Sequence, residues 1–515
     1  MLVFLRCILD RRRFDNNGTD MKPKSAYTAL SKHFRDVTAL GQISGLLSWD
    51  QETIMPSGSA LQRSEWMSAL EKLCHAQRTD PRIADWLDAI DEDNLSSVEA
   101  ANVRLISRQF ERQSRVPSSL AAQIARVTSQ AQGIWARARE NDDFKVFQSV
   151  LSEVLDLRRQ EAAVLADGDN LYDALLENYE PGMKEPELAV MLSGLRKGLI
   201  DLRAKVADSG IEFPTLQGHF SREQQTLIAR ELATAFGYNW DRGRLDFSVH
   251  PFSSGSFNDV RITTRVSEKD PFNCFYSTIH EVGHATYEQG IDQSMGLTML
   301  GRGVSMGVHE SQSRILENQL GRSRAFTGFL FNRMRNVFGD FGIANADTFY
   351  RVVNKMDRGF IRTEADEIQY NLHVLLRFDL ERQLIAGNLE VVDLEEAWNA
   401  RFLSDFGYPV DKPSNGVLQD VHWSVGLFGY FPTYSLGNIY AGELYEKMLV
   451  DVPELHADLG LGDTRAALTW LRTNIHRHGS FYEPRDTIKR AVGHRPTSAP
   501  LLAYLKSKFG EIYKL

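Results

Sequence analysis

Cysteine is scarce in this chain, and no hydrophobic run is long enough to cross a membrane. The 515 residues include three cysteines, Cys7, Cys74 and Cys274, which are scattered and odd in number. This usage argues against a disulfide framework and favours a reducing compartment. No apolar stretch approaches the roughly 20 residues that a membrane-spanning helix needs. We therefore expect a cytoplasmic protein without a membrane partner.

Clustered positive charge is also lacking. The chain has 59 Lys and Arg against 68 Asp and Glu, which gives a net charge of −9 and a pI of about 5.9. The one dense basic run is Arg11-Arg12-Arg13. Proteins that bind nucleic acids usually carry a basic patch or stripe, so we expect no nucleic-acid partner.

The first 20 residues differ from the rest of the chain. The apolar start Met1–Leu5 precedes its arginines, which is the reverse of the order in a secretory signal. Asp15–Asp20 is polar and turn-like, and Met21 looks like a natural protein start. We interpret residues 1–20 as a disordered extension or a start-codon artefact, with a weak organelle presequence as the minority alternative. Residues 21–515 then form the folded protein.

Helical periodicity continues almost throughout the chain from Ala26 onward. Apolar side chains recur at steps of three and four residues, as they do along one face of a helix. The clear exception is 245–264, where apolar residues alternate with others around a turn-forming segment, Ser253–Ser256. We predict a mostly α fold, with one large helical domain and a small β-sheet just before the most informative motif.

That motif is His280-Glu281-Val282-Gly283-His284, which reads H-E-x-x-H. Positions i and i+4 lie on one face of a helix, so two imidazoles there can bind one metal ion, with the carboxylate of Glu281 beside it. Asp270-Pro271 is a helix-start signal and Gly290 a helix stop, which predicts a helix over 271–289. Gly283 inside a helix suggests the close approach of another backbone or of substrate.

Two histidines cannot hold a catalytic zinc alone, because three protein ligands are usual. Tyr287 and Gly290 stand where a metzincin needs Gly and His, so that class is excluded. The best third ligand is Glu310, which opens a second apolar-patterned segment downstream. Taken alone, Glu310 could equally be a solvated glutamate near a helix start.

Six sequence motifs follow one another along the chain: His250–Phe252, Asp259–Thr263, His280–His284, His309–Gln312, Ile361–Asp366 and Gly416–Trp423. With these motifs, the chain resembles the carboxypeptidase Taq family of zinc metallocarboxypeptidases over essentially residues 21–515. The resemblance implies an α-helical fold with a deep central groove, a bound zinc that cobalt can replace, and a homodimer. It also implies release of single C-terminal amino acids with broad preference.

The chemistry of peptide hydrolysis gives each of these residue types a task. Zinc lowers the pKa of its bound water to about 7, and Glu281 can take the proton as general base. The developing oxyanion needs one or two further donors, for which His422 and Tyr434 are candidates. His422 could instead be a core histidine, and Tyr434 an ordinary packed aromatic residue.

An enzyme that acts at a free C-terminus also needs a fixed cation for the terminal carboxylate, and arginine can bind it through two parallel hydrogen bonds. Arg362 is the first choice because of its motif, and Arg261 is the second. Either could instead form a structural salt bridge, for example with Glu364 or Asp259. Asp259, His309 and Asp420 are open alternatives for orienting the metal-binding histidines.

The favoured function is therefore a zinc-dependent metallocarboxypeptidase that acts on peptides with a free C-terminus. The alternative is a zinc endo-oligopeptidase or dipeptidase on a similar helical groove, which would share H-E-x-x-H and a downstream Glu. A non-enzymatic helical scaffold is disfavoured because His280, Glu281, His284 and Glu310 are all present.

Overall fold

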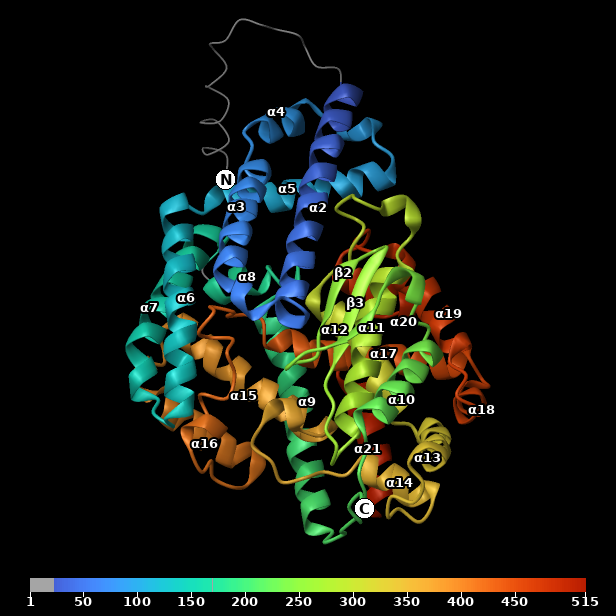
Figure 1. Ribbon diagram of the computed structural model, residues 1–515. Helices are drawn as coiled ribbons and strands as arrows, with labels where there is room; N and C mark the ends of the chain where they lie inside the picture. The colour runs from blue at the N-terminus through green and yellow to red at the C-terminus, as the bar shows by residue number, and fades with distance from the viewer. Residues whose placement is uncertain (1–22, 169) are drawn as a thin grey trace, which may run out of the picture.

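The computed structural model of the protein describes residues 23–168 and 170–515. The predictions for residues 1–20 and for a start at Met21 lie outside this part. Helices dominate the described chain and form one domain with one small sheet, which confirms the expected fold class (Figure 1). The helices before the sheet are α2 (Pro23–Thr53), α3 (Ala60–Arg78), α4 (Arg82–Ala89), α5 (Ser97–Arg115), α6 (Ser118–Glu140), α7 (Lys145–Leu165), α8 (Leu171–Leu176), α9 (Glu185–Asp208) and α10 (Arg222–Ala235).

The helices after the sheet build most of the core around the predicted site. Side-chain caps start several of them; Asp366, for example, accepts hydrogen bonds from the backbone N–H groups of Ile368 and Gln369. They are α11 (Phe272–Gly290), α12 (Met306–Arg314), α13 (Arg324–Phe338), α14 (Ala346–Val353), α15 (Glu367–Ala386), α16 (Leu394–Phe406), α17 (Pro432–Asp451), α18 (Leu455–Gly460), α19 (Arg465–Asn474), α20 (Pro484–Val492) and α21 (Ala499–Tyr513).

The sheet has three short strands in the order β1-β3-β2. They are β1 (Leu245–Phe247), β2 (Ser253–Ser256) and β3 (Asp259–Thr264), with β1 parallel and β2 antiparallel to β3. The small sheet is therefore confirmed, but the expected turn at Ser253–Ser256 is wrong. This segment is strand β2, because backbone pairing with β3 outweighs the turn preference of its residues.

Helix α11 lies at the centre of the fold, against β3, α10 and α12. It begins and ends one residue later than the predicted 271–289, and Asp270 accepts a hydrogen bond from the Phe272 N–H at its start. The side chains of Phe275, Ile279 and Val282 are fully buried on it. A helix enclosed in this way gives its functional side chains a rigid support.

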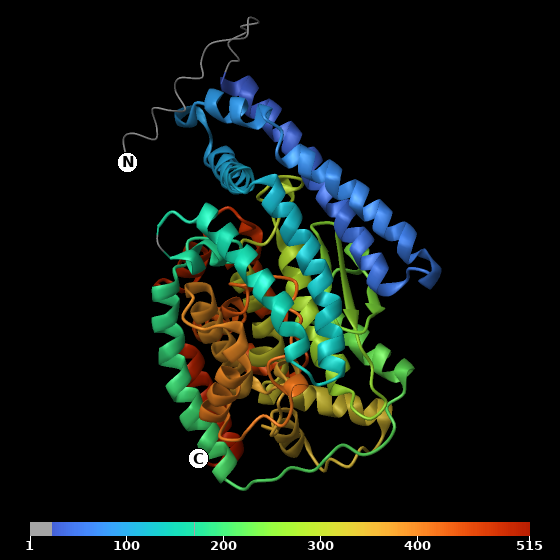
Figure 2. The same ribbon diagram turned by 90° about the vertical axis from the view of Figure 1, so that its left-hand side faces the viewer.

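The N-terminal helices form a smaller apolar core of their own. Leu30, Phe34 and Trp86 pack there together with Met299 and Leu300, which follow α11 in the chain. Figure 2 shows α2 and α3 side by side along one edge of the molecule. Helix α2 also runs over the sheet, where the Gln42 amide donates to the Ser256 hydroxyl.

Candidate metal centre and peptidase site

His280, His284 and Glu310 meet at the junction of α11 and α12. One ligand atom from each residue lies within 4.8 Å of the other two. Glu310 Oε2 is 3.9 Å from His280 Nε2 and 3.6 Å from His284 Nε2. Ligands about 2.0–2.2 Å from one ion in a tetrahedral site lie about 3.4 Å apart, so small side-chain movements would let these three atoms share one ion. Two imidazoles and one carboxylate fit a divalent metal, and they leave one position open.

The His280 ring is oriented by a residue that sequence reasoning missed. Its Nδ1 lies 2.9 Å from Glu317 Oε2, so Nδ1 carries the proton and Nε2 keeps its lone pair for the metal. Burial opposes the charged form of His280, but the hydrogen bond to Glu317 and the charge of Glu310 raise its pKa overall. Glu317 lies in a π-helical turn, Ile315–Gly321, that directly follows α12. Such turns often occur at functional sites.

The carboxylate of Glu310 is fixed on two sides. Arg314 Nε donates to Glu310 Oε1 over 2.7 Å, which leaves Oε2 directed at the two histidines. On the other side α17 approaches so closely that a Cβ at Gly437 would lie 2.5 Å from Glu310 Cβ. The carboxylate therefore has little freedom to leave the site.

Gly283 permits an equally close contact between α11 and α12. A Cβ there would lie 2.4 Å from Ser313 Cα and 2.5 Å from the Gln312 carbonyl oxygen. The predicted close approach at Gly283 is therefore confirmed, and the partner is the backbone of α12. This contact holds the helix that carries His280 and His284 against the helix that carries Glu310.

Glu281, between the two histidines in sequence, is 6% exposed. Burial, together with the negative charges of Glu310 and Glu317, raises the pKa of Glu281 to about 7 despite the opposing charge of His280. A carboxylate with this pKa can take up and return a proton near neutral pH.

A second charged cluster surrounds Arg362, which is 5% exposed. Arg362 pairs with Asp420 over 2.8 Å, and Arg377 pairs with the other oxygen of the same carboxylate. Two guanidinium groups and one carboxylate leave an excess positive charge. Arg362 thus forms a structural salt bridge, as its alternative interpretation expected, but the partner is Asp420 and not a sequence neighbour such as Glu364.

Tyr370 connects this cluster to the metal centre. Its hydroxyl accepts a hydrogen bond from Arg362 NH1 over 3.2 Å, and its ring lies 4.0 Å from the guanidinium carbon of Arg314. Arg314 in turn holds Glu310. Three contacts, through Tyr370 and Arg314, therefore connect Arg362 to Glu310, the proposed third metal ligand.

His422 and Tyr434 lie on the same side of the site as Arg362. His422 Nε2 is 3.2 Å from the Tyr434 hydroxyl, and the Tyr434 ring lies 4.8 Å from the guanidinium carbon of Arg362. Burial lowers the pKa of His422 to about 4, with Asp420 opposing the shift, so the ring is neutral at neutral pH. Burial also raises the pKa of Tyr434. Both side chains can thus donate a hydrogen bond while uncharged.

Arg261 lies in a different environment. It pairs with Asp259 on the same strand over 2.7 Å and lies over the ring of Trp49 of α2. These contacts match the structural salt bridge that was its alternative interpretation. Of the three open candidates for orienting the metal-binding histidines, only His309 touches one, with its Nδ1 2.7 Å from His284 Nδ1.

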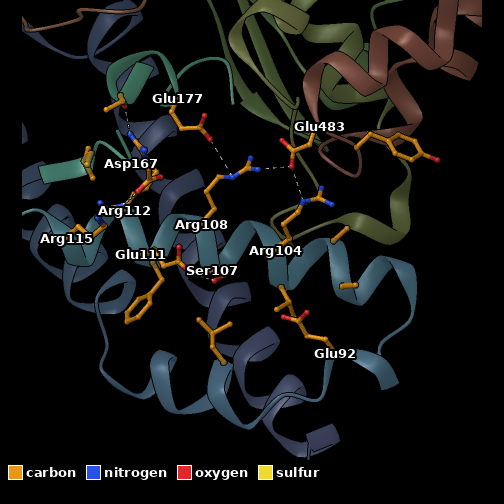
Figure 3. A pocket seen from close by; sticks show the side chains of 18 of the residues that line it. Glu92, Arg104, Ser107, Arg108, Glu111, Arg112, Arg115, Asp167, Glu177 and Glu483 are labelled. Carbon is orange, nitrogen blue, oxygen red and sulfur yellow. Dashed lines mark hydrogen bonds and ion pairs between the residues drawn. The ribbon is translucent and has the colours of Figure 1, made fainter. Parts of the chain in front are cut away.

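A cavity of about 1550 Å³ lies apart from this centre, between α5 and the loops before α8 and α20. Its lining includes none of the proposed metal ligands. Figure 3 shows the arginines of α5 directed into it, where Arg104 and Arg108 both contact Glu483 and Arg115 contacts Asp167. Glu177 also pairs with Arg108, so the three carboxylates balance these three guanidinium groups, and we assign no chemistry to this cavity.

Comparison with known proteins identifies the family. Residues 29–509 match the sequence model of the carboxypeptidase Taq (M32) metallopeptidases. The chain belongs to this family. It is 40% identical to thermostable carboxypeptidase 1 of Thermus thermophilus over 96% of this chain and all of that protein. It is 34% identical to carboxypeptidase 1 of Bacillus subtilis over 91% of this chain and 95% of that protein.

Solved structures agree with the sequence comparison. The M32 carboxypeptidase of Deinococcus radiodurans superposes with a TM-score of 0.92 at 37% identity, over 95% of this chain and all of that one. Metallocarboxypeptidase 1 of Trypanosoma cruzi gives 0.92 at 32% identity, over 94% of this chain and 99% of that one. The protein is thus a metallocarboxypeptidase, a peptide hydrolase that uses a divalent metal. None of the described helices combines the length and hydropathy that a bilayer crossing requires.

Proposed function

We propose that the protein is a zinc carboxypeptidase that removes single amino acids from peptides with a free C-terminus. The observation that carries this proposal is the chain of contacts from Glu310 through Arg314 and Tyr370 to Arg362. It connects a metal centre, which can activate water, to a buried excess positive charge, which can bind a terminal carboxylate.

His280, His284 and Glu310 would hold the metal. Zinc is favoured because two imidazoles and a carboxylate with one open position are the ligands of catalytic zinc, and cobalt is a possible substitute. When bound there, the ion would polarise the scissile carbonyl and acidify a water molecule. Glu281 takes the proton from the attacking water and delivers it to the leaving amine.

Arg362 is proposed to bind the terminal carboxylate of the substrate. The Arg362, Asp420 and Arg377 cluster has one more positive than negative charge, and a carboxylate would neutralise it. Arg261 is the second choice, although its guanidinium already faces Asp259. His422 and Tyr434 are proposed to donate hydrogen bonds to the oxyanion that develops at the cleaved bond.

The metal assignment can be tested on the purified protein. Elemental analysis should find one zinc per chain, and Glu310→Ala should lose both the ion and peptide hydrolysis. The Glu310 carboxylate supplies one of three ligands, and both histidines remain in that variant. Full metal occupancy with full activity in Glu310→Ala would overturn the assignment.

Two further proposals concern the state of the protein. Trp66 and Leu73 lie seven residues apart on one face of α3 and are 50% and 47% exposed. Such apolar exposure supports a homodimer through this helix. Trp66→Glu should then shift the mass in analytical ultracentrifugation from dimer to monomer.

Cys74 and Cys274 are buried and form no disulfide, which supports a reducing compartment such as the cytoplasm.

A further inference from the structure

The two metal-binding histidines are oriented in different ways. His280 contacts the carboxylate of Glu317 directly. His284 instead contacts another histidine, with 2.7 Å between its Nδ1 and Nδ1 of His309. His309 in turn has its Nε2 3.0 Å from Glu288 Oε1. A second imidazole therefore stands between His284 and the carboxylate of Glu288.

When both rings are neutral, only one placement of the ring protons satisfies these contacts. The Glu288 carboxylate can only accept, so His309 donates from Nε2 and has a lone pair on Nδ1. That lone pair accepts the proton on Nδ1 of His284. The Nε2 of His284 is then left with the lone pair that a metal requires, and this atom is the one that lies 3.6 Å from Glu310 Oε2.

The backbone around Gly303 stabilises the contacts between Glu288, His309 and His284. The Gly303 N–H donates to Glu288 Oε1 over 2.8 Å. A Cβ at Gly303 would lie 2.6 Å from His309 Cδ2, so any other residue at this position would push against the His309 ring. Glu288 lies one turn beyond His284 on α11, and its side chain is 8% exposed. The series is thus fixed at Glu288 as well as at His284.

We propose that His309 and Glu288 are positioning residues that fix the tautomer and ring orientation of His284 as a metal ligand. The inference rests on the proposed metal centre. It also explains why His309 and Glu310 are neighbours in α12: one short helix supplies a ligand and the residue that orients another ligand. Loss of such orienting partners typically weakens metal affinity by about 10–100-fold.

The test is the zinc affinity of the metal-free protein, measured by competition with a chelator, so it does not depend on activity. His309→Phe fills the space but cannot accept the proton, and affinity should fall about 10–100-fold. His309→Asn places an amide oxygen near the position of Nδ1 and should recover most of the loss. Glu288→Ala should also weaken binding. Adding it to His309→Phe should cost little more, because Glu288 acts through His309.

A matched control is His476→Asn. His476 is a buried histidine whose Nε2 contacts Gln312 Oε1 of α12 over 2.9 Å, and it touches no proposed ligand. This variant should keep its zinc affinity within about twofold of the parent, even if its unfolding temperature falls. Unchanged affinity in Glu288→Ala or His309→Phe, or additive losses in the double variant, would overturn the inference. A parent protein that binds no zinc would instead overturn the proposed function.

Discussion

Gly437→Ala should displace Glu310, a proposed metal ligand. The substitution adds a single methyl group at a residue that is not itself a proposed ligand. The new Cβ would lie 2.5 Å from Glu310 Cβ and 2.6 Å from Glu310 Cγ. Carbon atoms in ordinary contact are about 3.5–4.0 Å apart, so the two helices must separate by about 1 Å. The clash falls at the base of the Glu310 side chain, where rotation of the carboxylate alone cannot relieve it.

The expected loss of metal affinity follows from the narrow range of metal–ligand distances that a metal site accepts. Metal–ligand distances vary by only about 0.2 Å in a formed site, so a shift of about 1 Å removes Glu310 from coordination. Perturbed ligand orientation alone costs about 10–100-fold in affinity, and we expect at least this loss. Forcing an extra methyl group into a packed interior also costs about 1–3 kcal/mol of unfolding free energy.

Gly442→Ala on the same helix is the matched control for that general cost. Its Cβ would lie 2.8 Å from the Leu501 nitrogen, a comparable clash directed at α21 instead of the metal centre. Chelator competition and thermal unfolding of the metal-free proteins separate the two effects. Both variants should unfold earlier, and only Gly437→Ala should lose metal affinity. Equal affinity in the two variants would refute the argument.

Two further variants have distinct expected outcomes. Glu281→Gln should keep its metal and lose at least about 10²-fold in kcat, because the amide cannot accept the proton; near-normal turnover in a metal-loaded sample would assign the base to another group. Burial raises the pKa of Glu381 to about 7, so between about pH 4.5 and 7 the native state retains a proton that the unfolded state releases. The contribution of Glu381 to stability therefore falls as pH rises through this window, by up to about 1.4 kcal/mol per pH unit. Glu381→Gln should flatten this part of the curve of unfolding temperature against pH, and an unchanged slope would contradict the argument.

Local signals were sufficient to predict helix α11, which carries His280 and His284. Asp270 and Pro271 mark its start, and the apolar period of three and four residues continues to its end, so its bounds were predicted to within one residue. The same helical geometry brought His280 and His284 to one face. The glycine inside the helix indicated a close backbone contact, and the structure shows that contact with Gln312 and Ser313.

Contacts made across the fold could not be predicted in this way. Glu317 reaches His280 because a π-helical turn follows α12, and nothing in the local sequence marks that turn. Arg362 pairs with Asp420, which lies 58 residues further along the chain, and Arg377 of α15 pairs with the other oxygen of that carboxylate. Ser253–Ser256 reads as a turn but becomes a strand through pairing with β3. In each case tertiary contacts determine the outcome.

The central claim is that Arg362 binds the free C-terminal carboxylate of a peptide that is shortened one residue at a time. The most direct measurement compares one peptide as free acid and as C-terminal amide, with the parent protein, Arg362→Ala and Arg261→Ala, the variant of the second candidate. Mass spectrometry identifies the products and gives kcat/KM for each combination of protein and peptide.

An unpaired buried charge costs about 2–5 kcal/mol, so amidation and Arg362→Ala should each lower kcat/KM by about 30-fold to several thousand-fold. Together they should cost far less than the sum of the two losses, because both remove the same interaction. Arg261→Ala should cleave the free acid like the parent protein, and every product should differ from its precursor by one residue. Internal cuts in the amide at rates comparable to the free acid, or fully additive losses, would contradict the account.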